Sequence, residues 1–458
     1  MKAHYHLIGI GGIGMGTLAS LLLAKGNTVS GSDLKDSDMT LQLRKAGAII
    51  SIGHLAANIK KPDYVVYSSA VRMTNPEMME AVSRQIPTLK RAQVLAQLVN
   101  EQKGITVAGA HGKTTTSSMV AGILSKAQLN PTIAVGGIVK GTGASSNLGE
   151  GRYFVAEVDE SDGTFLYFNP HLSVITNIDF EHVDFYKDWQ GITDAYTKFL
   201  NCTVYGGCVI ACAEDERLWD LVKKSGVKAL MYGFNPQADV YARDVKTEGF
   251  GSSFTVFAGS KKIGDFKLSV VGRHNVLNAL AAISVGIQLN ISPLVMKEAL
   301  LEFTGVKRRF HLKGEVDGVM VIDDYGHHPT ELKATMNAAR LLNPKRLVVA
   351  FQPHRYSRTK FLLNEFADVL TIPDHLVLTD IYAASEKPSE GVGIDMLIAK
   401  IQEKKKDHVH YLKKEEILTY LKDTVQSGDL VLFLGAGDIY HLSDELVKVL
   451  QTKGVVHG

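Results

Sequence analysis

Residues 105–116 read ITVAGAHGKTTT, and this stretch decides the fold of the central part of the chain. Its first four residues, Ile105–Ala108, are apolar or β-branched and predict a buried strand. The glycine-bounded turn that follows leads into a predicted helix that runs to about Lys126. A strand, a glycine-rich turn and a helix in this order are typical of an α/β domain of the P-loop ATPase type.

The turn itself contains the residue types that a phosphate group needs. Glycine lets the backbone approach the phosphate, and N–H groups at a helix start point toward the anion. Lys113 supplies a mobile positive charge, and the hydroxyl of Thr114 is placed to reach Mg²⁺. The turn departs from the pattern G-x-x-x-x-G-K-[ST], because Gly109 comes two residues late, and a generic strand-to-helix turn is the alternative. The residues expected to bind nucleotide are Gly109, Ala110, His111, Gly112, Lys113, Thr114 and Thr115.

Carboxylates follow the next predicted strand, Tyr153–Val158, in the segment EVDESD (157–162). The carboxyl ends of parallel strands face one crevice, so Glu157 is expected near the phosphate turn. Mg²⁺ bound to ATP needs oxygen ligands close to the phosphates, although a solvated acidic loop would have the same composition. His182 follows the predicted strand Leu172–Ile178 and is a candidate for the same crevice, or else a structural histidine.

A second glycine pattern lies near the N-terminus, between the predicted strand His4–Ile10 and the predicted helix Met15–Lys25. Gly9, Gly11 and Gly14 fit G-x-G-x-x-G, and Asp33 follows near the end of the second strand. This pattern predicts a pyrophosphate site with a carboxylate for a ribose or base. An NAD-dependent oxidoreductase would explain this pattern but would leave the turn at 109–115 without a role. A UDP-linked substrate beside an ATP site explains both. The residues expected to bind it are Gly9, Gly11, Gly12, Ile13, Gly14 and Asp33.

Strand-like runs alternate with helical patterns along the whole chain, which predicts parallel sheets covered by helices. We expect an α/β fold of three domains: a Rossmann-like domain at 1–102, a P-loop ATPase-like domain at 103–309 and a second Rossmann-like domain at 310–458. Residues 239–271 differ, because alternating apolar residues and glycine-rich turns predict small antiparallel strands added to the central domain.

The bulk composition is typical of a soluble globular enzyme, with 45% hydrophobic and 21% charged residues. A net charge of +2 provides no electrostatic footprint for nucleic acid or a membrane surface. Neither a signal peptide nor a membrane-spanning segment is expected from the apolar runs. The three cysteines are an odd number without a C-x-x-C pair and indicate buried thiols in a reducing cytoplasm. The sequence is compatible with a monomer or a dimer.

Taken together, these motifs resemble the Mur ligase family over essentially the whole chain. GAHGKTTT (109–116) resembles the phosphate loop of the family, with Ala110 in place of threonine. Four further segments resemble functional segments of the family. Its metal-binding and substrate-binding strand ends are matched by AEVDESD and NIDFEHVD, its adenine-contacting helix start by GRHNVLNALAA, and its phosphate-contacting arginine segment by GVKRRF. In the third domain, DDYGHHPTE (323–331), FQPHRYSRT (351–359) and GAGDI (435–439) are similar to the branch that uses L-alanine.

The resemblance implies an ATP-dependent ligase that joins L-alanine to UDP-N-acetylmuramate in peptidoglycan precursor synthesis, with an acyl-phosphate intermediate. It assigns ATP and Mg²⁺ to Lys113, Thr114 and Glu157, and a second Mg²⁺ to the vicinity of His182. It implies further nucleotide contacts at His274, Asn275, Asn278, Arg309 and Asp324. The implied substrate contacts are Ser161, Tyr325, His327, Arg355 and Arg358. Both arginines would bind the carboxylate of alanine.

Three alternatives remain open from the sequence. A related ligase recycles a whole tripeptide onto UDP-N-acetylmuramate, and it differs from the L-alanine branch around the segment 351–359. A nucleotide-binding regulator without catalysis would release no ADP. A dehydrogenase would bind NAD(P)H. Several sister ligases contain a carbamylated lysine near the second metal; Lys198 lies near that position, but the segment YTKFLN (196–201) resembles the branch without it.

Overall fold

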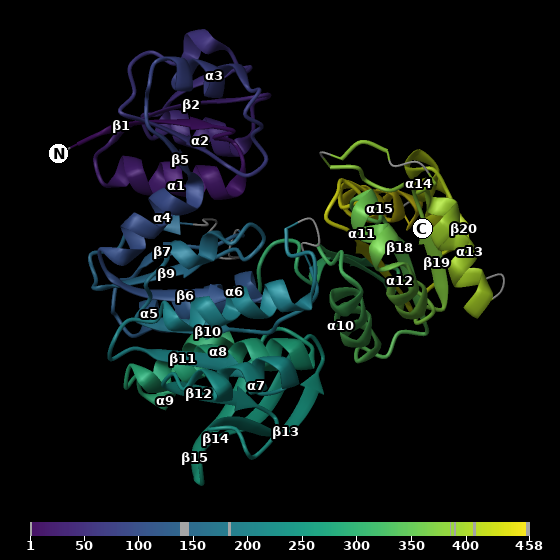
Figure 1. The fold of residues 1–458 in the computed structure, drawn as a ribbon. Helices are drawn as coiled ribbons and strands as arrows, with labels where there is room; N and C mark the ends of the chain where they lie inside the picture. Colours follow the sequence, from purple (N-terminus) through teal and green to yellow (C-terminus); the bar gives the residue numbers. More distant parts are fainter. Residues whose placement is uncertain are drawn as a thin grey trace. The chain divides into compact units, whose positions relative to one another are not determined.

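The computed structural model describes residues 2–137, 146–181, 185–384, 386–388, 391–405 and 409–454 (Figure 1). The chain forms two compact units. The first comprises Met1–Lys246, Ser253–Ser269 and Asn275–Thr304, and the second comprises Thr247–Ser252, Val270–His274 and Gly305–Gly458.

The N-terminal part of the first unit is a five-stranded parallel sheet in the order β3-β2-β1-β4-β5. The chain turns to opposite sides of β1, so the carboxyl end of β1 is a switch point where α/β sheets bind ligands. The strands are β1 His4–Ile8, β2 Thr28–Asp33, β3 Ile49–Ile52, β4 Tyr64–Tyr67 and β5 Thr88–Lys90. The helices are α1 Ile13–Ala24, α2 Asp38–Lys45, η1 Ala56–Asn58, α3 Pro76–Ser83 and α4 Arg91–Asn100.

The rest of the first unit is built on a ten-stranded sheet in the order β15-β14-β13-β12-β11-β10-β6-β9-β7-β8. Its strands are β6 Lys103–Ala108, β7 Thr132–Ala134, β8 Ser146–Asn147, β9 Tyr153–Glu157, β10 Leu172–Ile175, β11 Cys208–Cys212, β12 Ala229–Gly233, β13 Val240–Glu248, β14 Gly251–Ala258 and β15 Lys261–Leu268. Its helices are α5 Lys113–Lys126, η2 Thr164–Tyr167, α6 Trp189–Asn201, α7 Glu216–Ser225, α8 Arg273–Gln288 and α9 Pro293–Glu302. Strand β6, which leads into the phosphate turn, lies between β10 and β9 and is parallel to both.

The second unit contains a six-stranded sheet in the order β16-β17-β21-β18-β19-β20, parallel except for the antiparallel edge strand β16. Its strands are β16 His311–Val316, β17 Val319–Asp324, β18 Arg346–Phe351, β19 His375–Leu378, β20 Val409–Tyr411 and β21 Asp429–Leu434. Its helices are α10 Pro329–Arg340, α11 Tyr356–Phe361, α12 Leu363–Val369, α13 Ile394–Lys404, α14 Lys414–Thr424 and α15 His441–Gly454.

Strand β18 shows why this sheet is covered on both faces. Leu347, Val349 and Phe351 belong to a core cluster that includes residues of α10, α12 and α13. Val348 and Ala350 belong to a second cluster that includes residues of α14 and α15. Successive side chains of a strand point to opposite faces, so an unbroken apolar run indicates burial on both.

The structure agrees with most of the predicted elements and corrects some of their ends. The predicted strand His4–Ile10 ends at Ile8, because Gly9 adopts a left-handed backbone with φ of +77° and begins the turn. The predicted strand Leu172–Ile178 ends at Ile175. The small strands expected within residues 239–271 are β13, β14 and β15, and their two-residue connections can join only antiparallel neighbours. Six strands have no clear pattern in the sequence and were not predicted: β3, β5, β7, β8, β12 and β16.

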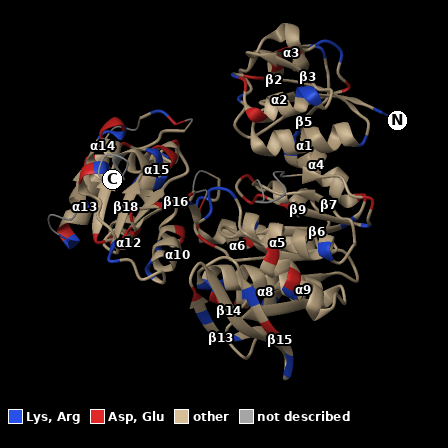
Figure 2. Cartoon of the chain, turned by 180° about the vertical axis from the view of Figure 1, so that it is seen from behind, with Lys and Arg blue, Asp and Glu red and all other residues tan. Residues whose placement is uncertain are grey.

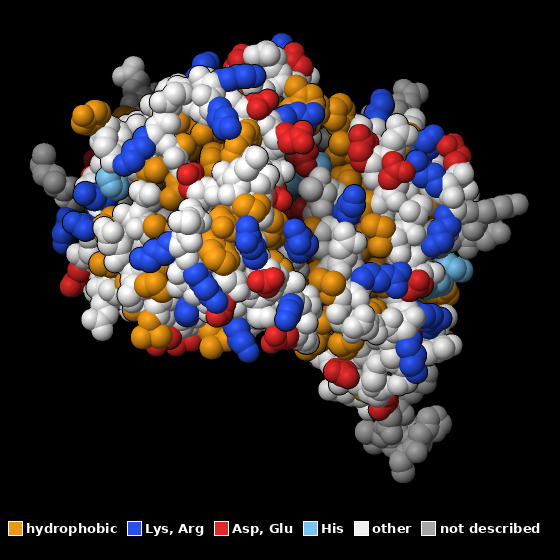
Figure 3. Space-filling model, turned by 90° about the horizontal axis from the view of Figure 1, so that it is seen from below, with side chains coloured by type: hydrophobic (Ala, Val, Ile, Leu, Met, Phe, Trp, Pro, Cys, Tyr) orange, Lys and Arg blue, Asp and Glu red, His pale blue; other side chains and the backbone are white. Residues whose placement is uncertain are grey.

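Charged residues of both signs are distributed over the helices and loops of each unit (Figure 2). On the face drawn in Figure 3, lysines and arginines are intermingled with aspartates, glutamates and apolar side chains. Among the described residues, no helix has the length and apolar character needed to cross a membrane.

Candidate active site

The phosphate turn connects β6 to α5 and depends on two glycines with left-handed backbones. Gly109 has φ of +125° and Gly112, the N-cap of α5, has φ of +81°. A Cβ atom on Gly109 would collide with the hydroxyl of Thr176, and one on Gly112 would lie 2.6 Å from Oδ1 of Asn278. Both positions therefore require glycine, and the start of α5 presents backbone N–H groups to the turn.

Lys113 is held inside this turn by a carboxylate. Its Nζ donates to Oε1 and Oε2 of Glu160, at 3.0 and 3.1 Å, and to the carbonyl oxygens of Gly109 at 2.5 Å and Ala110 at 3.2 Å. Burial alone would lower the pKa of Lys113, but the negative charges of Glu160, Asp159 and their neighbours raise it above its usual value. Lys113 is therefore a permanent positive charge at the turn.

Glu157 ends β9 directly beside the strand that leads into the turn. In the register of the two parallel strands, Glu157 is paired with Val107 of β6. Its Oε2 accepts a hydrogen bond from the backbone N–H of Gly136 at 2.7 Å. Thr114, at the start of α5, is buried. A carboxylate thus ends the strand beside β6, and a hydroxyl side chain lies in the first turn of the helix that follows β6. Both groups are oxygen donors of the kind that Mg²⁺ prefers.

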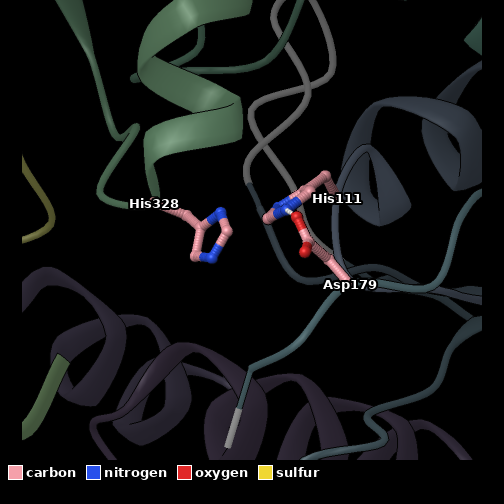
Figure 4. Close-up of side chains that lie close together, drawn as sticks. All are labelled: His111, Asp179 and His328. Carbon is pink, nitrogen blue, oxygen red and sulfur yellow. Dashed lines mark hydrogen bonds and ion pairs between the residues drawn. The ribbon is translucent and has the colours of Figure 1, made fainter. Parts of the chain in front are cut away.

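His111 is fixed by the segment that follows β10. Its Nε2 lies 2.9 Å from Oδ2 of Asp179, and Figure 4 shows the ring directed at that carboxylate. The backbone N–H of His111 donates to Oδ1 of Asn177 at 2.9 Å, and its carbonyl oxygen accepts from the hydroxyl of Thr176 at 2.6 Å. Three of these partners, Thr176, Asn177 and Asp179, were not predicted from the sequence, although their place directly after a buried strand is a signal for a site.

Two further predicted nucleotide contacts lie on α8 in the first unit. Asn278 is buried, and its Oδ1 accepts from the hydroxyl of Thr116 at 3.1 Å, which ties α8 to α5. Its Nδ2 donates to Oδ1 of Asn275 at 3.3 Å. Ser161 belongs to the acidic loop, where its N–H donates to Oδ1 of Asp159 at 2.9 Å. His182, the predicted second metal residue, lies outside the described residues.

The N-terminal glycine turn is shaped by the end of β2. The N–H groups of Gly9 and Ile10 donate to the carbonyl oxygen of Ser32, at 2.8 and 3.0 Å. The N–H of Gly11 donates to Oδ2 of Asp33 at 2.8 Å, and a Cβ atom on Gly11 would meet that same oxygen. The turn then enters α1, whose start is expected to face a diphosphate.

Arg91 is a candidate that the sequence analysis missed. It begins α4 immediately after β5, at the same edge of the sheet as the glycine turn. A Cβ atom on Gly14 would lie 3.4 Å from three atoms of the Arg91 guanidinium. A positive charge thus lies against the first turn of α1.

In the second unit, Asp324 is buried at the carboxyl end of β17, and the half-buried Arg309 lies in the segment just before β16. Asp324 accepts hydrogen bonds from the N–H groups of Phe310 and Gly326, both at 2.7 Å. Burial raises the pKa of Asp324. Arg309 lies 3.4 Å from a carboxylate oxygen of Glu331 and 5.2 Å from the ring centre of Tyr325.

The predicted alanine contacts lie at the start of α11, shortly after β18, in the second unit. Arg355 is the N-cap of α11 and has φ of +73°, an unusual backbone for a residue with a side chain. Arg358, one turn along, donates to the carbonyl oxygen and to Nδ1 of His354, both at 3.2 Å. Burial, together with nearby positive groups, lowers the pKa of His354 to about 3, so its ring is a neutral acceptor for Arg358.

The other two predicted contacts adjoin this segment. The ring centre of His327 lies 5.4 Å from that of Tyr325 and 5.8 Å from that of His354. His274 belongs to this second unit too, and burial with the charge of Arg309 lowers its pKa to about 4. The second unit therefore brings together Tyr325, His327, Arg355 and Arg358 around His354.

Three family models match consecutive parts of the chain. The Mur ligase family catalytic domain matches residues 4–103, the Mur ligase middle domain matches 107–286 and the Mur ligase glutamate ligase domain matches 308–437. The chain belongs to the Mur ligase family. The resemblance found in the sequence motifs is thereby confirmed.

Individual Mur ligases match over almost their full length. A UDP-N-acetylmuramate–L-alanine ligase of Desulforapulum autotrophicum is 46% identical over 449 residues, which are 98% of each chain. The crystal structure of UDP-N-acetylmuramate–alanine ligase from Thermotoga maritima is 30% identical and has a TM-score of 0.83, covering 99% of this chain and 100% of that one. A murein peptide ligase structure from Psychrobacter arcticus is 26% identical with a TM-score of 0.72, covering 98% and 99%. The predicted α/β fold with three sheet-containing domains is confirmed, whereas the roles of single residues stay predictions.

Proposed function

We propose that this chain joins L-alanine to UDP-N-acetylmuramate at the expense of ATP, releasing ADP and phosphate, in the synthesis of peptidoglycan precursors. The observation that carries the proposal is the 46% identity to a UDP-N-acetylmuramate–L-alanine ligase over 98% of both chains. The reaction would serve cell-wall growth, and with it cell shape and division. We assign it to the cytoplasm, where thiols such as the unpaired Cys202, Cys208 and Cys212 stay reduced.

The ATP site is assigned to the turn Gly109–Thr115. Its support is the left-handed glycines, the helix start and the largely buried Lys113. The lysine would offset the negative charge of the β- and γ-phosphates, and the N–H groups at the start of α5 would hold phosphate oxygens. The proposed adenine contacts are His274, Asn275 and Asn278. Arg309 is the proposed contact of phosphate, and Asp324 is that of the ribose.

Mg²⁺ is the proposed metal, and the residues present fit it. Glu157 offers a carboxylate and Thr114 a hydroxyl, both hard oxygen donors, beside the phosphate turn. Magnesium at such a site neutralises phosphate charge. His182 remains the proposed residue of a second metal site.

UDP-N-acetylmuramate is assigned to the N-terminal sheet and L-alanine to the second unit. The turn at Gly9–Gly14 lies at the switch point of the sheet and would hold the diphosphate, with Asp33 at the ribose or base. Ser161 is a proposed contact of the sugar nucleotide. Arg355 and Arg358 would bind the carboxylate of alanine, because a guanidinium can hold a carboxylate through two parallel hydrogen bonds. Tyr325 and His327 lie beside them.

An amine cannot displace oxide from a carboxylate, because oxide is a poor leaving group. The carboxyl group of the substrate must therefore be activated before alanine attacks it. An oxygen of the lactyl carboxylate attacks the γ-phosphorus of ATP, and the bond from that phosphorus to the ADP oxygen breaks, which yields an acyl phosphate and ADP. The neutral amine of alanine then attacks the carbonyl carbon and gives up a proton. Phosphate leaves from the tetrahedral intermediate and the amide remains. Lys113 would stabilise the charge that develops on the transferred phosphoryl group.

The proposal is tested by phosphate release with each amino acid in turn, with and without UDP-N-acetylmuramate. Release that requires both UDP-N-acetylmuramate and L-alanine supports it. The likeness to a murein peptide ligase supports a second candidate, in which the acceptor is a free peptide. Release with the tripeptide L-alanyl-γ-D-glutamyl-meso-diaminopimelate but not with L-alanine would favour that candidate. No release with either acceptor would overturn both.

A further inference from the structure

A carboxylate with no exposed surface lies at the centre of the N-terminal domain. Glu77, in the first turn of α3, is 0% exposed. Its Oε2 accepts from the hydroxyl of Ser32 at 2.6 Å and from Nε2 of His6 at 3.3 Å. Its Oε1 accepts from Nδ2 of Asn58 at 2.5 Å and from the N–H of Leu55 at 3.3 Å. A buried charge is costly unless hydrogen bonds replace its hydration, and here four donors do so.

The charge of Glu77 sets the direction of the hydrogen bonds that reach its carboxylate. Burial by itself would raise the pKa of Glu77, but the hydrogen bonds from His6, Ser32 and Asn58 lower it, so the group is an ionised acceptor. Ser32 must then donate to Glu77, and its oxygen is left to accept from Nδ1 of His54, at 2.9 Å. His6 must donate to Glu77 through Nε2, and its Nδ1 lies 2.9 Å from the hydroxyl oxygen of Ser30. In the neutral form of each ring, these contacts place the proton of His6 on Nε2 and that of His54 on Nδ1.

The same network reaches the glycine turn. The carbonyl oxygen of Ser32 accepts from the N–H groups of Gly9 and Ile10. The next residue, Asp33, holds the N–H of Gly11 with its carboxylate and the N–H of Gly53 with its carbonyl oxygen. Glu77 thus ties three segments to one point: the end of β2, the turn that β2 supports, and residues 54–58 after β3.

We propose that Glu77 is a positioning residue for the sugar nucleotide, which holds the end of β2 and the segment 54–58 in the geometry that binds the nucleoside diphosphate. This inference rests on the proposed function, because it takes the turn at Gly9–Gly14 as the diphosphate site. Glu77 touches no substrate and acts through Ser32. A change at Glu77 should therefore alter the binding of the sugar nucleotide and leave the phosphate turn at Lys113 unaffected.

Glu77→Gln tests the proposal with a near-isosteric change. The amide places an N–H₂ donor against groups that already donate, so the network must rearrange. We expect the KM for UDP-N-acetylmuramate to rise about tenfold, the effect of one lost hydrogen bond to a charged group, with kcat and the KM values of ATP and L-alanine within about twofold. Glu80→Gln is the matched control, since Glu80 lies one turn further along α3 and pairs at the surface with Arg84.

Ser32→Ala is the second variant, because it breaks the link between Glu77 and β2 without removing a buried charge. It should raise the same KM and leave the others unchanged. Nitrogen NMR provides an independent readout at about pH 8.5, where ordinary imidazoles are neutral. Wild-type His54 should be protonated on Nδ1 and His6 on Nε2, and Glu77→Gln should change the tautomer of His54.

Two outcomes overturn the inference. One is a folded Glu77→Gln variant, with native circular dichroism, whose KM for UDP-N-acetylmuramate stays within twofold of wild type while Ser32→Ala also has no effect. The other is an equal rise in all three KM values, which indicates a general structural role. A failure of the proposed function is distinguishable, because the wild-type chain itself would then release no phosphate with UDP-N-acetylmuramate and L-alanine.

Discussion

Lys113 and Glu160 form a largely buried ion pair at the phosphate turn. Nζ of Lys113 lies 3.0 and 3.1 Å from the two carboxylate oxygens, and the side chains are 15% and 5% exposed. Removing one partner of such a pair leaves the other charge buried without compensation. A variant of Lys113 must therefore be judged both on catalysis and on the state of the turn.

Lys113→Ala should abolish most of the ligation while leaving the binding of UDP-N-acetylmuramate nearly intact. The lysine would act mainly on charge that develops during phosphoryl transfer, so we expect kcat to fall about 100-fold or more. The sugar nucleotide is assigned to a separate sheet of the same unit, and its affinity is measured by calorimetry. Lys126→Ala is the control on the same helix, where the lysine pairs with Glu302 at the surface. A Lys113→Ala variant that ligates at a near-normal rate would remove this turn from the proposed mechanism.

Glu157→Gln should raise the Mg²⁺ requirement more than it raises the apparent KM for alanine. The amide keeps the size of the side chain but loses the negative charge that a hard cation prefers. The measurement is a Mg²⁺ titration of the initial rate at fixed ATP. Glu150→Gln, an exposed position shortly before β9, is the control. An unchanged metal curve would show that Glu157 serves the structure through its hydrogen bond to Gly136.

The fold could be predicted where local chemistry and tertiary burial agree. Strand β6 and the turn to Lys113 were identified because an apolar run, two glycines and a lysine occur in one short stretch. Strands β3 and β8 were missed because they are short edge strands of four and two residues. An edge strand is paired on one side only and can form with few apolar residues, so its hydrophobic pattern in the sequence is weak. The residue bounds of the three domains stay predictions.

The contacts that the sequence analysis missed come from segments far apart in the sequence. Glu160 was noted as one of several carboxylates, but its pairing with Lys113, 47 positions earlier, needs the structure. Asp179 and His111 meet only because β10 lies beside β6. Glu77 lies on a short helix without a motif, and only its complete burial singles it out. A pairing between distant segments leaves no periodic signal in the sequence.

The stability of the chain should fall as the pH is lowered from about 6.5 to about 4, in part through His274. Burial and the charge of Arg309 lower its folded-state pKa to about 4, below the usual value of about 6.5 in the unfolded chain. The unfolded state then binds more protons in this window, so the stabilisation is present above pH 6.5 and is lost toward pH 4.

Urea unfolding at a series of pH values measures this component. His274→Asn should flatten the decline between pH 6.5 and 4, because the imidazole that must stay neutral in the folded state is gone. His441→Asn, at an exposed position at the start of α15, is the control for the substitution itself. Equal slopes in wild type and His274→Asn would contradict the expectation.

Arg358→Ala should weaken the use of L-alanine and spare ATP. Arg358 lies one helical turn after Arg355, and its Nη1 atom donates to the carbonyl oxygen of His354, so the backbone before α11 already orients it. Each charge-assisted hydrogen bond to the carboxylate is worth about 1.5–3 kcal/mol, so kcat/KM for alanine should fall roughly 10- to 100-fold.

Substitution by lysine separates the shape of the side chain from its charge. Arg358→Lys should recover part of the loss, because an ammonium provides a point charge without the two parallel donors of a guanidinium. Lys360→Ala, at an exposed position of α11, is the control for general loss of charge. Steady-state kinetics with each substrate varied in turn decide the matter. If the KM for ATP rises steeply while the KM for alanine holds, Arg358 belongs to the nucleotide site, and the segment 351–359 does not select the acceptor.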